Sequence, residues 1–165
     1  MTPPPYYLED LTPGMRFTTP PTLMTEEAII RFGREFDPQP YHVDPEAARE
    51  TFFGGLVASG WHTVAVMTAM NIRSQLQLAE GQIGMGVESV RFLQAVRPGD
   101  RIHLEMEILE VKPSESRRGW GIIKVLWTGM NQHGEAVLTL QPSILVRGRN
   151  CPDPVTPDPQ DPEAA

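Results

Sequence analysis

The longest apolar stretch of the chain is the feature that most limits its possible folds. This stretch is WHTVAVMTAMNIRSQLQL, residues 61–78, and as far as Ile72 its hydrophobic residues fall on nearly every face of a helix. A helix that is apolar all round has to be covered by other elements. We therefore predict a long central helix that is buried inside the protein and begins next to Gly60.

Four segments that alternate hydrophobic and charged residues follow this helix, a pattern typical of half-buried strands. Turn-forming residues separate them, at 98–100, 113–118 and 131–135, and such short connections favour antiparallel neighbours. An extended segment at 14–24, interrupted by Pro20-Pro21, precedes the helix. The pattern predicts an α+β fold in which an antiparallel sheet of about five strands surrounds the helix. The four segments are GVESVRFLQAV, DRIHLEMEILEV, WGIIKVLWTGM and AVLTLQPSILVRGR.

Proline and charge divide the chain of 165 residues into one domain and two unlike ends. Six of the 17 prolines lie in residues 1–21 and five lie in residues 150–165, which also hold four acids and no base. The formal charge is -7, yet residues 22–149 contain 15 acids and 13 bases. We predict a Pro-rich N-terminal extension (1–11), a single domain (12–149) and a disordered, acidic, Pro-rich tail (150–165).

The composition also disfavours several classes of function. A nearly neutral domain has no basic face for a phosphate backbone, so we expect no nucleic-acid partner. No uncharged apolar run reaches 18 residues and no basic segment precedes an apolar one at the N-terminus, so we expect neither a membrane span nor a secretory signal. The single cysteine, Cys151, fits a reducing compartment, and we expect a cytoplasmic protein.

The loop DPQPYHVD, residues 37–44, contains the best acid–base candidates. Its two prolines stiffen it, so Asp37 and His42 can face one small volume. An imidazole exchanges a proton near neutral pH, and a carboxylate accepts a hydrogen of water. The alternative is structural, with Asp37 closing a turn and His42 at the surface. Asp44 is explained by capping a helix that starts at Pro45, and no second His or Cys lies at metal-ligand spacing from His42, so we expect no metal site.

Ser59-Gly60, at the start of the predicted central helix, is a candidate oxyanion site. A glycine there leaves backbone N–H groups uncovered, and the helix dipole favours an oxygen that gains negative charge. The alternative is a tight packing turn in which Ser59 is a simple N-cap.

Together these motifs resemble the signature of the MaoC-like dehydratases, which include the (R)-specific enoyl-CoA hydratases. The runs FGREFDPQPYHVDPEAA and FFGGLVASG are similar to the family pattern D-x-N-P-x-H-x-D, then F-G, then A-H-G. Later segments resemble the family as well, so the resemblance covers about residues 12–149; they are FLQAVRPGD, SRRG, NQHGEAV and LVRGR. The resemblance implies a hot-dog fold, in which the sheet wraps the central helix. It also implies a homodimer, or a dimer or trimer of such dimers, with an acyl-CoA site at the interface.

The resemblance further implies a lyase reaction and roles for individual residues. Asp37 and His42 match the catalytic pair that activates water for reversible addition to a trans-2-enoyl-CoA, giving an (R)-3-hydroxyacyl-CoA. Gly60 matches the glycine whose N–H holds the thioester carbonyl. Since CoA is part of the substrate, no separate cofactor is expected. The other residues expected at the substrate site are Ser59, Pro40 and Phe53.

Two residues depart from the family pattern, and two other functions stay open. Gln39 stands where the family has Asn, and Ser59 stands where A-H-G has His. A hot-dog thioesterase would share the fold and the acyl-CoA ligand, but many of them carry a carboxylate on the central helix, and residues 61–79 contain no Asp or Glu. A non-catalytic acyl-CoA-binding protein would need the fold without the Asp37–His42 pair.

Overall fold

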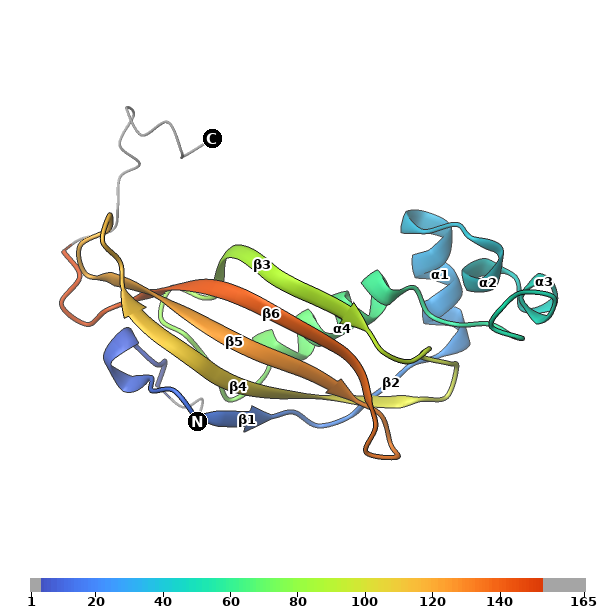
Figure 1. Ribbon diagram of the computed structural model, residues 1–165, viewed down its shortest axis with the longest axis horizontal. Helices are drawn as coiled ribbons and strands as arrows, with labels where there is room; N and C mark the ends of the chain where they lie inside the picture. Colours follow the sequence, from blue (N-terminus) through green and yellow to red (C-terminus); the bar gives the residue numbers. More distant parts are fainter. Residues whose placement is uncertain (1–3, 153–165) are drawn as a thin grey trace, which may run out of the picture.

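A twisted antiparallel sheet and one long helix that packs against it make up most of the structure (Figure 1). The computed structural model describes residues 4–152. The sheet contains six strands in this part of the chain: β1 (Arg16–Thr18), β2 (Thr22–Leu23), β3 (Ile83–Phe92), β4 (Arg101–Pro113), β5 (Trp120–Met130) and β6 (Ala136–Arg147). The helices are η1 (Leu8–Asp10, a 3-10 turn), α1 (Glu26–Phe36), α2 (Pro40–Val43), α3 (Pro45–Arg49) and α4 (Gly60–Ile72).

The strand order is β1-β4-β5-β6-β3, so successive hairpins form the middle of the sheet and β3 forms one edge. The prediction of about five strands is one short, because the segment at 14–24 forms two strands. Both β1 and β2 pair with β4, and Pro20-Pro21 lie between them. Proline has no N–H to donate to a neighbouring strand, and this interrupts the pairing.

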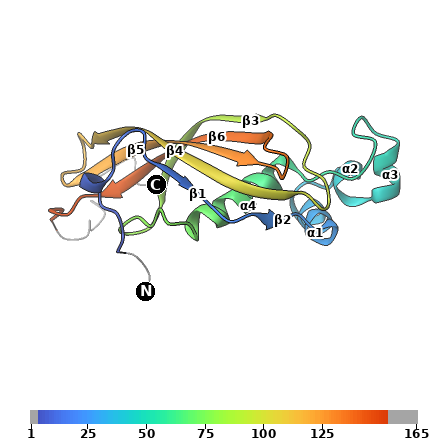
Figure 2. The same cartoon turned by 90° about the horizontal axis from the view of Figure 1, so that it is seen from below.

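The central helix α4 lies along one face of the sheet and contacts β4 and β6 (Figure 2). Its covered side is buried and holds His62, Thr63, Met67, Met70 and Asn71. The prediction of a helix buried on every side is wrong for the single chain. The opposite side is exposed, at Trp61, Ala65, Thr68 and Ile72. A single sheet can cover only one side of a helix, so the apolar residues on the far side remain uncovered.

Three short helices gather at the end of the sheet where α4 begins (Figures 1 and 2). Thr25 caps α1 by accepting a hydrogen bond from the Ala28 N–H. Gly33 lets α1 approach α2 closely, because a Cβ at this position would lie 2.7 Å from the carbonyl oxygen of His42. This contact places the C-terminal end of α1 beside the loop that carries the predicted acid–base pair.

The residues that precede β1 pack onto the sheet and onto the segment that follows α4. Leu11 is buried, and Tyr6 and Leu8 pack against the core. Residues 4–11 of the predicted extension therefore form part of the packed structure. The predicted disordered tail falls mainly on residues 153–165, which lie outside the described residues. Among residues 4–152, no helix is both long enough and apolar enough to cross a membrane.

Candidate active site

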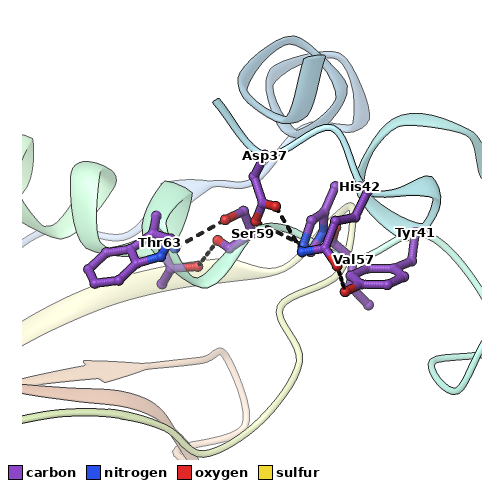
Figure 3. A network of polar contacts seen from close by, with 8 residues as sticks. Asp37, Tyr41, His42, Val57, Ser59 and Thr63 are labelled. Atoms are coloured by element: carbon purple, nitrogen blue, oxygen red, sulfur yellow. Dashed lines mark hydrogen bonds and ion pairs between the residues drawn. The ribbon is translucent and has the colours of Figure 1, made fainter. Parts of the chain in front are cut away.

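His42 is a buried imidazole whose hydrogen-bonding state is set by the backbone. Only 5% of the residue is exposed, and Nδ1 lies 2.7 Å from the carbonyl oxygen of Val57 (Figure 3). A carbonyl only accepts, so Nδ1 carries the proton in this bond. When the ring is neutral, Nε2 therefore presents a lone pair. Nε2 lies 3.3 Å from Oδ2 of Asp37, which makes this nitrogen and this oxygen two acceptors that face each other.

Asp37 ends α1 and turns its carboxylate toward His42 (Figure 3). Its N–H donates to the Gly33 carbonyl at 2.9 Å, and its Oδ1 accepts a hydrogen bond of 2.8 Å from Nε2 of Gln39. Burial raises the pKa of Asp37, but hydrogen bonds from Gln39 and Ser59, together with the charge of His42 whenever its ring is protonated, outweigh it, so the net pKa lies below the ordinary value. Asp37 is therefore ionised at neutral pH and ready to accept a hydrogen.

The first turn of α4 supplies a backbone donor to the same region. Ser59 caps the helix, because its Oγ accepts from the Trp61 N–H at 3.2 Å and its carbonyl accepts from the Thr63 N–H at 3.1 Å. Within residues 4–152, no hydrogen bond engages the Gly60 N–H. A Cβ on Gly60 would overlap the ring of Phe92, so glycine is needed for this close packing. The site thus combines a free N–H with the positive end of a helix.

One cavity of about 640 Å³ contains these groups. Its walls are rich in aromatic residues, and Arg97 beside it donates from Nη2 to the Phe53 carbonyl at 2.7 Å. Tyr41 and Phe53 are tilted against each other at 5.0 Å, and Trp61 and Phe92 meet edge to face at 5.8 Å. The cavity can therefore hold an apolar group next to one acid–base pair and one N–H donor.

The structure brings together most of the residues that the sequence placed at the site. Asp37, His42, Phe53, Ser59 and Gly60 all line the cavity. Pro40 does not line it; this residue is exposed and begins α2, and its expected role stays a prediction.

Sequence reasoning missed Tyr41 and Phe92, which also line the cavity, and treated Gln39 only as a departure from a pattern. Arg97, which lines the cavity too, was considered only as one of five arginines that could reach CoA phosphates or be ordinary surface charges. Tyr41 lies next to His42 in the chain, and this adjacency was an available signal. Phe92 gave no local signal, because pairing of β3 with β6 brings it to the site.

His62, on the first turn of α4, is a second buried imidazole. Its ring stacks on Phe32 at 4.8 Å, and its Nδ1 has no hydrogen-bond partner in the part of the chain that is described. Burial and, to a smaller extent, the neighbouring Arg31 hold the pKa of His62 below its ordinary value. The pKa of His62 is therefore lower in the folded protein than in the unfolded chain, where it lies near 6.5.

We expect His62 to make the protein less stable in mild acid. The unfolded state binds more protons between pH 6.5 and the lowered pKa of His62, so the free energy of unfolding should fall as the pH falls through this window. In His62→Phe, which keeps a ring against Phe32, this fall should be smaller. Urea unfolding midpoints at pH 7.5 and 5.5 measure it, with His133→Gln on the exposed β5–β6 turn as the control. An unchanged fall in His62→Phe would assign the acid sensitivity to other groups.

No group of three or more His, Cys, Asp or Glu side chains is placed to hold a metal ion within residues 4–152. Asp37 and His42, which line the cavity next to the Gly60 N–H, are groups able to exchange a proton there.

Comparison with known proteins identifies the family. A family model described as "MaoC like domain" matches residues 10–126. The uncharacterized protein YdeM of Bacillus subtilis (strain 168) is 31% identical over 140 residues, which is 85% of this chain and 98% of YdeM.

Two solved structures show the same arrangement of elements. The MaoC-like dehydratase from Rhodospirillum rubrum superposes with a TM-score of 0.83 at 42% identity, over 87% of this chain and 98% of that one. The R-hydratase PhaJ1 from Pseudomonas aeruginosa gives a TM-score of 0.69 at 23% identity, over 92% and 94% of the two chains, and shows the fold alone. The chain therefore belongs to the MaoC-like dehydratase family, whose members are generally hydratases and dehydratases, and it has the hot-dog fold.

Proposed function

We propose that the protein catalyses the reversible addition of water to a trans-2-enoyl-CoA, giving an (R)-3-hydroxyacyl-CoA. The observation that carries the proposal is the arrangement of three groups on one cavity. Oδ2 of Asp37 and Nε2 of His42 are acceptors 3.3 Å apart, and the Gly60 N–H is a donor with no hydrogen-bond partner among residues 4–152. Hydration of an enoyl thioester needs a base for water, an acid for the α carbon and a donor for the carbonyl oxygen.

The proposed steps follow from the hydrogen bonds of His42. Since Nδ1–H is bound to the Val57 carbonyl, Nε2 takes one proton from a water while Asp37 accepts the other hydrogen of that water. The water oxygen forms a bond to the β carbon, and the double-bond electrons move toward the thioester carbonyl. The Gly60 N–H stabilises the resulting enolate oxygen. The proton on Nε2 then passes to the α carbon, which restores neutral His42.

The substrate class is part of the same proposal. Apolar and aromatic walls suit the acyl chain, and the family resemblance implies a CoA thioester, with CoA entering as part of the substrate. A reducing, cytoplasmic setting fits the single cysteine, Cys151.

The test is to measure the enoyl absorbance of a panel of trans-2-enoyl-CoAs, from short to long chains, in the presence of the purified protein. The proposal predicts loss of this absorbance and a 3-hydroxyacyl-CoA product of R configuration by chiral chromatography. A thiol reagent added to saturated acyl-CoAs detects hydrolysis. Release of free CoA without hydration would replace the proposal with a thioesterase. Binding of acyl-CoA in calorimetry without turnover would replace it with a binding protein.

We also propose that two copies of the chain associate through β3 and the exposed side of α4. The edge strand β3 presents Met85 and Val87, each 52% exposed, and α4 presents Trp61 and Ile72. Unpaired edge strands and contiguous apolar patches are typical of protein interfaces. Trp61 also lines the cavity, so a second copy on this surface would cover one side of the site.

The dimer proposal predicts a mass of two chains in analytical ultracentrifugation. Val87→Lys should shift the mass toward that of one chain, because the dimer would bury an unpaired ammonium group at the interface. Leu109→Lys is the matched control, since Leu109 is an exposed apolar residue on β4. A single-chain mass for the wild-type protein at micromolar concentration would contradict the proposal, as would an unchanged dimer in Val87→Lys.

A further inference from the structure

We propose that Tyr41 is a positioning residue that acts on Asp37 through the side-chain amide of Gln39. The inference rests on the proposed function, because it assigns to Asp37 the task of holding the water. It goes further by naming two residues outside the acid–base pair that decide how the carboxylate is presented.

A chain of two hydrogen bonds links the three side chains. The Tyr41 hydroxyl donates to Oε1 of Gln39, and Nε2 of Gln39 donates to Oδ1 of Asp37 at 2.8 Å. This leaves Oδ2 of Asp37 facing His42 at 3.3 Å. The carboxylate of Asp37 can only accept a hydrogen bond, so it faces the NH2 end of the Gln39 amide. The Tyr41 hydroxyl donates to the oxygen end of the same amide. The two residues together therefore determine the orientation of the amide.

Gln39 needs this second contact because little else holds its side chain. Pro38 and Pro40 flank it and restrict the backbone, but the side chain is exposed and has three rotatable bonds. Ordering such a side chain opposes a hydrogen bond with an entropy loss of similar size. With the Asp37 contact alone, the amide would spend part of its time turned away. The bond from Tyr41 restricts it to the orientation in which its N–H groups face the carboxylate.

Tyr41 is itself held in place, so its hydroxyl has a defined position. Its ring meets the ring of His42 edge to face at 4.5 Å and lies 5.0 Å from the ring of Phe53. Its carbonyl accepts from the Val57 N–H at 3.0 Å, and Arg97 holds the Phe53 carbonyl. The aromatic wall of the cavity and the orientation of Asp37 are therefore connected through one phenol.

The hydrogen-bonded chain from Tyr41 through Gln39 to Asp37, which we call the clamp, has a direct chemical consequence for Asp37. The groups that act on its carboxylate are Gln39 and His42 from the 37–44 loop and the hydroxyl of Ser59 from the start of α4. With Oδ1 engaged by Gln39, Oδ2 is the oxygen presented to a water beside His42. Loss of the Gln39 bond leaves burial less opposed, which raises the pKa of Asp37 and frees the carboxylate to rotate.

The experiment is a double-mutant cycle with Tyr41→Phe, Gln39→Ala and the double variant, and with Tyr6→Phe as a control. Tyr6 lies outside the cavity and packs on Phe17. Tyr41→Phe keeps the ring and removes only the hydroxyl. We expect kcat to fall about 3- to 10-fold, as for loss of one hydrogen bond, with a smaller change in KM.

Two results distinguish a Tyr41 that acts through Gln39 from a Tyr41 that contributes independently of it. If Tyr41 acts through Gln39, the double variant should be no slower than Gln39→Ala alone. Fully additive effects of the two substitutions on kcat would overturn the proposal. Titration of the Asp37 carboxyl carbon by NMR, without substrate, gives a readout independent of turnover, and its pKa should rise in Tyr41→Phe. A wild-type protein that hydrates no thioester would refute the proposed function, whereas an unshifted Asp37 titration would refute the clamp.

Discussion

Replacement of Asp37 by Asn should lower kcat for enoyl-CoA hydration by about 10²- to 10⁴-fold, the range for loss of positioned proton transfer. The change keeps the size of the side chain but puts an amide where a carboxylate accepts the hydrogen of water. His42→Gln should have an effect of the same order, because it removes the nitrogen that takes the proton. The two effects should not add, since both residues act on one water. Steady-state kinetics with the best substrate of the panel measure the two single variants and the double variant.

Asp44→Asn is the matched control for this prediction. Asp44 lies in the same loop and accepts from the Glu46 and Ala47 N–H groups at 2.9 and 3.1 Å, as an N-cap of α3. Asn is as good an N-cap as Asp, so this variant should keep both its stability and its activity. Wild-type turnover in both Asp37→Asn and His42→Gln would refute the mechanism. An equal loss in Asp44→Asn would point to disturbance of the loop.

Gly60→Ala should lower kcat/KM by about 10²- to 10³-fold, as for loss of an oxyanion donor. The added methyl group would overlap the ring of Phe92, so the ring has to move. The methyl group and the displaced ring would both narrow the space beside the Gly60 N–H, which the thioester carbonyl has to approach. Circular dichroism and thermal melting check that the variant is folded before its kinetics are interpreted.

A second substitution separates this steric effect from general disruption. In Gly60→Ala/Phe92→Ala the overlapping ring is gone, so kcat/KM should recover part of the way toward that of Phe92→Ala alone. If the Gly60→Ala variant is folded and has the kcat/KM of the wild type, the thioester carbonyl does not depend on close approach to the start of α4.

The proximity of Asp37 and His42 could be predicted from the sequence because it depends on local geometry. Asp37 and His42 are five positions apart in a stretch with two prolines, and the end of α1 and the start of α3 fall where proline and capping rules place them. The same is true of the Ser59 cap at the start of α4. These features depend on backbone preferences within a few residues, which the chain carries wherever it folds. The stretch 37–44 was predicted as a loop throughout, and the structure forms the short helix α2 inside it.

The orientation of the pair was not predictable in this way. The tautomer of His42 depends on the carbonyl of Val57, 15 residues away in sequence, and the packing around Gly60 depends on Phe92 at the end of β3. The clamp formed by Tyr41 and Gln39 involves residues close in sequence, but it requires the aromatic wall that Phe53 and Arg97 complete. Side chains that meet across elements have no fixed spacing in the sequence.

Apolar periodicity by itself determined that one long helix packs against an antiparallel sheet, because burial of hydrophobic surface depends only on which residues share a face. It could not determine how much of that helix one chain covers. Only the tertiary structure showed that β3 ends the sheet and that one side of α4 stays uncovered, since the extent of a sheet is decided by strand pairing between distant segments. The site follows the same division. Its chemical groups could be identified in the sequence, but they line one cavity only because α1, α4 and β3, which are distant in the sequence, pack together.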